Sequence, residues 1–154
     1  MSKAFTSEET EDASIPGRIP ERPPVGQERP IREEGLRALV ARHDALLKER
    51  AAATGDAQKD LDHKIAVASV AIDSVRVMPV APPDGTVRFG NVVTLRWDDG
   101  RVQKVTIVGP DEAEGDAISI ASPLGRALLG AREGAVLEID RPRGAAEATV
   151  VSIA

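Results

Sequence analysis

The sequence predicts an α+β protein, with an N-terminal antiparallel helical hairpin followed by an antiparallel sheet that carries one short helix. Apolar residues between positions 33 and 77 recur at the three- and four-residue spacing of a helix face. From Val87 onward, apolar and polar residues alternate in short runs that are separated by turn sequences. The first 30 residues show neither pattern. We therefore expect three segments: an arm over 1–30, a hairpin over 31–79 and a sheet domain over 80–154.

The arm is rich in proline and charge and poor in apolar residues. Its prolines are Pro16, Pro20, Pro23, Pro24 and Pro30. Such a segment buries too little apolar surface to offset the entropy lost on ordering. We expect a flexible, disordered arm, extended near Pro23-Pro24. A docking peptide is the alternative function for it.

The first arm of the hairpin is predicted over residues 33–53. Glu33 and Glu34 lie in its first turn, where carboxylates favour the positive end of the helix dipole. Gly55 is a natural helix terminator. Its apolar stripe is formed by Leu36, Leu39, Val40, His43, Leu46 and Leu47.

The second arm is predicted to begin at Asp56 as its N-cap and to end before Pro79. Because a tight turn joins the two amphipathic arms, they should pack antiparallel. The stripe of the second arm is Leu61, Ile65, Ala68, Ile72 and Val75.

The C-terminal half predicts five strands and one helix. Asp84-Gly85 and Asp98-Asp99-Gly100 are turn sequences, and Ser122-Pro123 supplies a cap and a first helical position. We expect Leu124, Leu128 and Leu129 in the core. The short connections favour an antiparallel sheet. The expected strands are 87–97, 102–108, 117–121, 135–140 and 146–153, with the helix at 124–129.

Composition excludes several classes of protein. The chain has 154 residues, a formal charge of −5 and no cysteine. Basic and acidic residues are interleaved, so we expect no direct sequence-specific binding to DNA. No apolar run is long enough for a membrane span, and no secretory leader is evident, so we expect a cytoplasmic protein without membrane contact. With few aromatic residues, the core should be aliphatic.

The sequence contains no catalytic cluster and predicts neither a metal site nor a cofactor. Ser122 lacks the glycine-flanked elbow of a nucleophilic serine. No glycine-rich phosphate loop follows a predicted strand. We therefore do not expect an enzyme.

Two motifs in the C-terminal half point to a known family. One is Val108-Gly109-Pro110-Asp111-Glu112-Ala113, and the other runs from Ile118 through Ser122-Pro123-Leu124-Gly125-Arg126-Ala127-Leu128-Leu129-Gly130. Over residues 84–154 the chain resembles the C-terminal domain of the GreA/GreB transcription elongation factors. The opening Met1–Phe5 and the run Ile31-Arg32-Glu33-Glu34-Gly35-Leu36 are similar to the N-terminal half of that family.

The resemblance implies an FKBP-like fold for the sheet domain, without isomerase activity, and RNA polymerase as the partner. The domain would dock on the rim of the polymerase secondary channel, and the hairpin would enter the channel. The residues that the resemblance assigns to polymerase binding are Asp111, Glu112, Ser122, Pro123 and Arg126. A solvated loop is the alternative for Asp111 and Glu112, and a local bridge to either is the alternative for Arg126.

The hairpin departs from the pattern of cleavage-stimulating Gre factors. Their tip carries an Asp-x-x-Glu pair that helps to hold an Mg²⁺ ion at the polymerase active site, and this chain has no such segment. Asp56, Asp60 and Asp62 are the remaining candidates for metal ligands. The first arm should measure about 31 Å, roughly 18 Å less than the family's long arms. This short hairpin is similar to that of Rnk-type polymerase binders.

Three hypotheses follow. The first is a polymerase-binding regulator that does not stimulate transcript cleavage. The second is an authentic cleavage factor that uses Asp56 with Asp60 or Asp62. The third is an isomerase or general binding module of FKBP type, which the scarcity of aromatic residues disfavours.

Overall fold

The computed structural model describes residues 17–154, and the chain divides into two compact units. One unit contains residues 17–28 and Arg37–Ser74, and the other contains Arg29–Leu36 and Val75–Ala154. The first sixteen residues of the expected arm, with the Met1–Phe5 similarity, lie outside the described part. Between residues 17 and 154 no helix is both long and apolar enough to cross a membrane.

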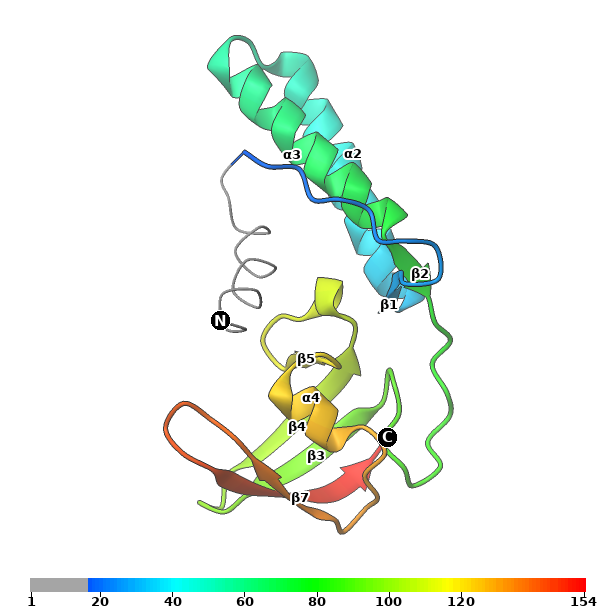
Figure 1. Ribbon diagram of the computed structural model, residues 1–154, viewed down its shortest axis with the longest axis vertical. Helices are drawn as coiled ribbons and strands as arrows, with labels where there is room; N and C mark the ends of the chain where they lie inside the picture. The colour runs from blue at the N-terminus through cyan, green and yellow to red at the C-terminus, as the bar shows by residue number, and fades with distance from the viewer. Residues whose placement is uncertain (1–16) are drawn as a thin grey trace, which may run out of the picture. The chain divides into compact units, whose positions relative to one another are not determined.

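The helical hairpin is confirmed. It consists of α2 (Glu33–Ala52) and α3 (Asp56–Asp73), which run side by side in Figure 1. Gly55 has a φ of 62°, a conformation that favours glycine, and reverses the chain between the helices. It is also the N-cap of α3, so Asp56 is the first residue of the helix and not the cap that we expected.

The second helix ends earlier than its apolar stripe suggested. Ser74 caps α3, with its hydroxyl donating to the carbonyl of Val70, and is fully buried. Val75, expected on the helix, instead begins the strand β2 (Val75–Val77). The prediction that Val75 belongs to the helix was wrong. Val75 follows Ile72 at helical spacing, but β-branched valine also favours a strand.

A strand that the sequence did not predict begins at Arg29, inside the segment expected to be a flexible arm. This strand, β1 (Arg29–Ile31), pairs in parallel with β2, and Ile31 lies opposite Val77. Ile31 has no exposed surface. Three-residue strands are too short to show a period of two, and this pairing joins segments far apart in the sequence. Local patterns therefore could not reveal it.

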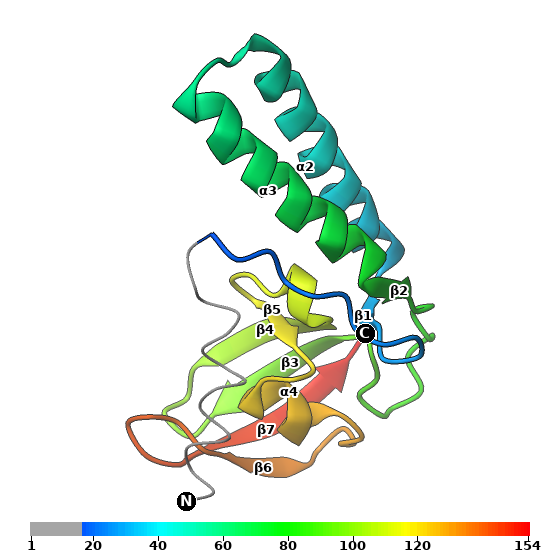
Figure 2. The ribbon, with the colours of Figure 1, turned by 45° about the horizontal axis from the view of Figure 1, so that its top comes forward.

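The sheet of the second unit has the strand order β5-β4-β3-β7-β6 (Figure 2). All neighbours are antiparallel except β4 and β5, which are parallel, contrary to a purely antiparallel expectation. Residues 109–116 return along β4, so that Ala117 lies opposite Thr106. The bounds are β3 (Val92–Trp97), β4 (Val102–Val108), β5 (Ala117–Ser119), β6 (Val136–Ile139) and β7 (Ala146–Ile153).

The core of this unit is aliphatic, as the composition predicts. Alternate residues of β3 face inward: Val93, Leu95 and Trp97 are buried, whereas Arg96 is exposed. Trp97 is the single aromatic side chain of the buried cluster, and its indole N–H donates to Gln103. The other buried members are Val87, Val105, Ile107, Leu128, Ile139, Ala146, Ala148, Val150 and Ile153.

The short helix α4 (Pro123–Leu128) lies over one face of the sheet (Figures 1 and 2). Leu128 is fully buried, but Leu129, expected in the core, is 38% exposed. The helix ends at Leu128, and Leu129 adopts an extended conformation as its C-cap. Gly125 is buried, and it must be glycine because a Cβ atom at this position would lie 1.9 Å from the carbonyl oxygen of Ser119.

We predict that Gly125→Ala destabilises the protein by about 1–3 kcal/mol, because either α4 or the backbone at Ser119 must move. The better helix propensity of alanine offsets only part of this cost. Chemical denaturation followed by circular dichroism measures the change. Arg126→Ala, at the next position of the same helix, is the control and should stay within about 0.5 kcal/mol of the wild type. Equal stability of Gly125→Ala and the wild type would contradict the close packing.

Candidate functional site

The acidic motif forms a single turn of 3₁₀ helix, η2 (Pro110–Glu112), that binds the segment leading into α2. Asp111 accepts two hydrogen bonds from the guanidinium of Arg29, at 2.7 and 3.0 Å. Glu112 accepts from the backbone N–H of Arg32 at 2.9 Å and from its Nε at 3.0 Å. Both arginines belong to the same unit as the turn.

These two carboxylates are largely shielded from solvent. The side chain of Asp111 is 14% exposed and that of Glu112 is 6% exposed. The hydrogen bonds that Arg29 donates to Asp111 raise the pKa of the guanidinium above its ordinary value. A carboxylate this buried is stable only with charged or hydrogen-bonding partners, which Arg29 and Arg32 supply. The turn therefore differs from the solvated loop that was the alternative for Asp111 and Glu112, because Arg29 and Arg32 already pair with its charges within the unit.

Two glycines allow this close approach. A Cβ atom at Gly109 would lie 1.7 Å from the carbonyl oxygen of Pro30, and one at Gly35 would lie 2.3 Å from the carboxyl of Glu112. Neither glycine has a positive φ, so the requirement is space and not backbone conformation. Gly35 belongs to the run Ile31–Leu36 and Gly109 to the motif Val108–Ala113, so the two glycines come from different halves of the chain. The motifs thus fit against each other, which neither motif could indicate alone.

The remaining candidates lie at the start of α4. Ser122 Oγ accepts from the N–H of Gly125 at 3.0 Å and donates to the carbonyl of Ser119 at 2.7 Å, so this hydroxyl caps the helix as predicted. Pro123 and Arg126 are exposed. Arg126 Nε donates to the carbonyl of Ala121 at 3.0 Å.

The local bridge to the acidic motif, which was the alternative role for Arg126, is not formed. Within residues 17–154, the carboxylates of Asp111 and Glu112 bond to Arg29 and Arg32 instead. Pro123 and Arg126 of α4 and the C-cap residue Leu129 are exposed at three-residue spacing. We call this set the α4 surface. Leu129, which we expected in the core, belongs to this surface because the helix ends one residue before it.

The three aspartates at the hairpin tip do not gather into a metal site. Asp62 pairs with Arg50 across the hairpin, and Asp60 lies 3.3 Å from Nζ of Lys64, one turn further along α3. The Asp62 carboxylate raises the pKa of Arg50. Asp56 is exposed in the first turn of α3. Over the described range 17–154, no group of three or more potential metal-ligating side chains comes together.

Comparison of the chain with known proteins identifies its family. Residues 82–154 match the model described as "Transcription elongation factor, GreA/GreB, C-term". The transcription elongation factor GreA of Thermomicrobium roseum is 33% identical over 150 residues, which covers 80% of this chain and 96% of the relative. The chain belongs to the GreA/GreB family.

Other relatives carry both names of the family. GreA of Solidesulfovibrio magneticus is 38% identical over 150 residues, which covers 81% of this chain and 92% of the relative. GreB of Pseudomonas putida is 37% identical over 98 residues, covering 62% of this chain and 60% of the relative. A crystal structure of GreA factor homolog 1 from Thermus thermophilus matches 82% of this chain and 99% of its own, with 24% identity and a TM-score of 0.42.

In this GreA/GreB-family chain, the contact between Gly35 and Glu112 can be tested by changing the side-chain volume at both positions. We predict that Gly35→Ala destabilises the wild type by about 1–3 kcal/mol, because the new methyl group displaces the Glu112 carboxylate from Arg32. In a Glu112→Ala background the obstruction is absent, and alanine is the better helix former, so the same change should cost nothing. Denaturation of the four variants gives the coupling energy.

Gly109→Ala provides the control for this cycle. Its Cβ atom would meet the backbone carbonyl of Pro30, which the Glu112→Ala change leaves in place. Its cost should therefore be the same in both backgrounds. An equal cost of Gly35→Ala with and without the Glu112 side chain would show that the two positions do not pack together.

Proposed function

We propose that this protein is an RNA polymerase-associated regulator of transcript elongation that docks through its C-terminal unit at the rim of the secondary channel. Its membership of the GreA/GreB family supports the association with polymerase, since its relatives are named transcription elongation factors. The protein is not itself an enzyme in this proposal. It acts on the reaction of its partner.

The observation that carries the docking proposal is the exposure of Pro123 and Arg126 at the start of α4. Ser122 holds this turn through its hydrogen bonds to Ser119 and Gly125, so the α4 surface is rigid before binding. A preformed surface loses little conformational entropy on association. An exposed arginine beside apolar atoms is typical of residues that contribute strongly to protein interfaces.

Asp111 and Glu112 act indirectly in this proposal. Their carboxylates are bonded to Arg29 and Arg32, so binding of a basic group from polymerase would first require these pairs to break. We infer that they position β1 and the start of α2. Direct contact with polymerase is left to the α4 surface.

We further propose that the hairpin does not stimulate transcript cleavage. Metal-assisted hydrolysis needs carboxylate oxygens that are available to the ion. Asp60 and Asp62 are paired with Lys64 and Arg50, and the hairpin lacks the Asp-x-x-Glu segment. The helices contain 20 and 18 residues, so they span only about 30 and 27 Å. An authentic cleavage factor is the alternative function.

The docking proposal predicts that Arg126→Glu weakens binding to core RNA polymerase by at least about tenfold, because it reverses a charge in the α4 surface. Affinity is measured with immobilised polymerase and purified variants. The control is Arg132→Glu, the same charge change at another exposed arginine of this unit, which should remain within about twofold of the wild type. Failure of the wild type to bind would remove the proposal, and equal loss in both variants would remove the α4 surface.

The cleavage proposal is tested on stalled elongation complexes. Added protein should release no short 3′ RNA fragments, and it should inhibit the cleavage that an authentic Gre factor stimulates. Asp60→Asn should leave both results unchanged. If the wild type instead releases short fragments, and Asp60→Asn abolishes them while Asp44→Asn on α2 does not, the alternative function is correct.

A further inference from the structure

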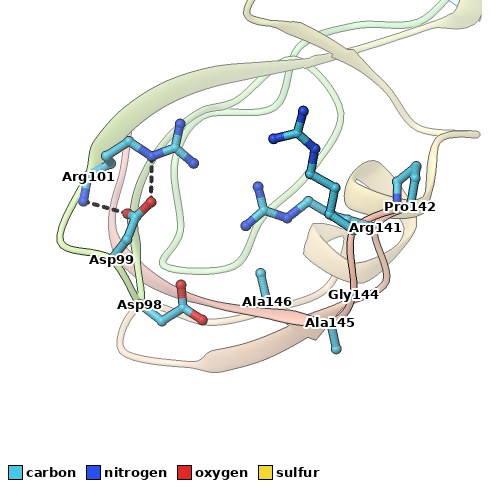
Figure 3. Close-up of a pocket in the computed structure, with 9 residues that line it drawn as sticks. Asp98, Asp99, Arg101, Arg141, Pro142, Gly144, Ala145 and Ala146 are labelled. Carbon is cyan, nitrogen blue, oxygen red and sulfur yellow. Dashed lines mark hydrogen bonds and ion pairs between the residues drawn. The ribbon is translucent and has the colours of Figure 1, made fainter.

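A cavity of about 460 Å³ lies between two turns of the sheet, and none of the residues that line it belongs to the motifs described above. One turn joins β3 to β4 and contributes Asp98, Asp99 and Arg101. The other joins β6 to β7 and contributes Arg141 and Arg143. Figure 3 shows Arg101 and Arg141 on opposite sides of this space.

Both carboxylates of the cavity accept hydrogen bonds, Asp98 from the strand β7 and Asp99 from its own turn. Asp98 accepts from the backbone N–H of Glu147 at 3.2 Å. Asp99 accepts from the backbone N–H of Arg101 at 3.0 Å and from its Nε at 2.8 Å, as the dashed lines in Figure 3 show. The backbone N–H of Arg101 lowers the pKa of Asp99, and the charges of Arg101 and Arg141 act in the same direction. Asp99 is thus a stable carboxylate that holds Arg101 in place.

The two arginines of the second turn have no such partner. Within residues 17–154, neither Arg141 nor Arg143 forms an ion pair with a carboxylate. Arg141 lies over the ring of Trp97, with its guanidinium carbon 4.4 Å from the ring centroid. This stacking fixes a guanidinium at the cavity without neutralising its charge.

The cavity therefore carries a net positive charge in an acidic protein. Three arginines face two aspartates, whereas the whole chain has a formal charge of −5. Guanidinium groups bind phosphate through paired hydrogen bonds, and several of them around one space suit a group with more than one negative charge. The volume lies in the range of about 300–1,000 Å³ that is usual for small-molecule sites.

We propose that this cavity binds a small phosphate-bearing anion, with Arg141 and Arg143 as the phosphate ligands. The source of the phosphate is either a free diphosphate or the phosphate chain of a nucleotide. A nucleic-acid strand is disfavoured, because strand binding needs positive charge along an extended surface and this chain is acidic overall. The proposal concerns the free protein and does not depend on its association with polymerase.

Isothermal titration calorimetry on the full chain tests this proposal, with inorganic pyrophosphate and ATP as separate probes. We expect saturable binding of pyrophosphate that weakens at least about tenfold in Arg143→Ala, because one of two unpaired guanidiniums is lost. Arg141→Ala should weaken it similarly but also removes the contact with Trp97. Arg143→Ala is therefore the primary variant, and thermal unfolding of each variant verifies that the fold is intact. Tighter binding of ATP than of pyrophosphate would identify a nucleotide as the source.

The matched control is Arg132→Ala, which removes the same charge from an exposed position that does not line the cavity. It should bind pyrophosphate within about twofold of the wild type. The proposal is overturned if neither probe binds saturably at millimolar concentration, or if Arg132→Ala and Arg143→Ala lose affinity equally. Binding of a short single-stranded RNA that exceeds both small probes and depends on Arg143 would also overturn it, in favour of a strand-binding surface.

Discussion

The contact between the acidic turn η2 and the segment Arg29–Leu36 is the constraint on which this structure depends. It joins residues about 80 positions apart and places the start of α2 in the same compact unit as the sheet. Removing one partner would leave a buried charge without compensation, which costs more than an ordinary surface ion pair. The two glycines of the contact add a steric requirement that no larger residue meets. The ion pairs of Asp111 and Glu112 and the small size of Gly35 and Gly109 together hold this contact.

The sequence of this chain predicts well the features that depend on residues close together along the chain. The hairpin follows from helical periodicity, and the turn at Gly55, the strand 102–108 and the Ser122 cap follow from residue types at single positions. The strands β1 and β2, the parallel direction of β5 and the partners of Asp111 depend on contacts between distant segments. A three-residue strand carries no period, and a carboxylate in a loop does not indicate which arginine it will meet. Because the sequence does not reveal these partners, we placed Asp111 and Glu112 at an interface from the family resemblance alone.

The second motif combines several tasks in a few residues. Ser122 caps the helix, Gly125 allows the helix to approach β5, and Leu128 enters the core. These tasks fix the backbone and leave Pro123 and Arg126 directed to the surface. A motif can therefore be required for folding at most of its positions and for binding at only a few. A sequence match alone does not separate the two kinds of position.

The small sheet of β1 and β2 has a topological consequence for the hairpin. β1 ends at Ile31, just before α2 starts at Glu33, and β2 begins at Val75, just after α3 ends at Asp73. The hairpin is therefore an insertion between two paired strands, closed at its base by their hydrogen bonds. Whole helical turns can be added to both arms or removed from them without altering a residue of the C-terminal sheet. The length of the hairpin can thus change in evolution independently of the α4 surface.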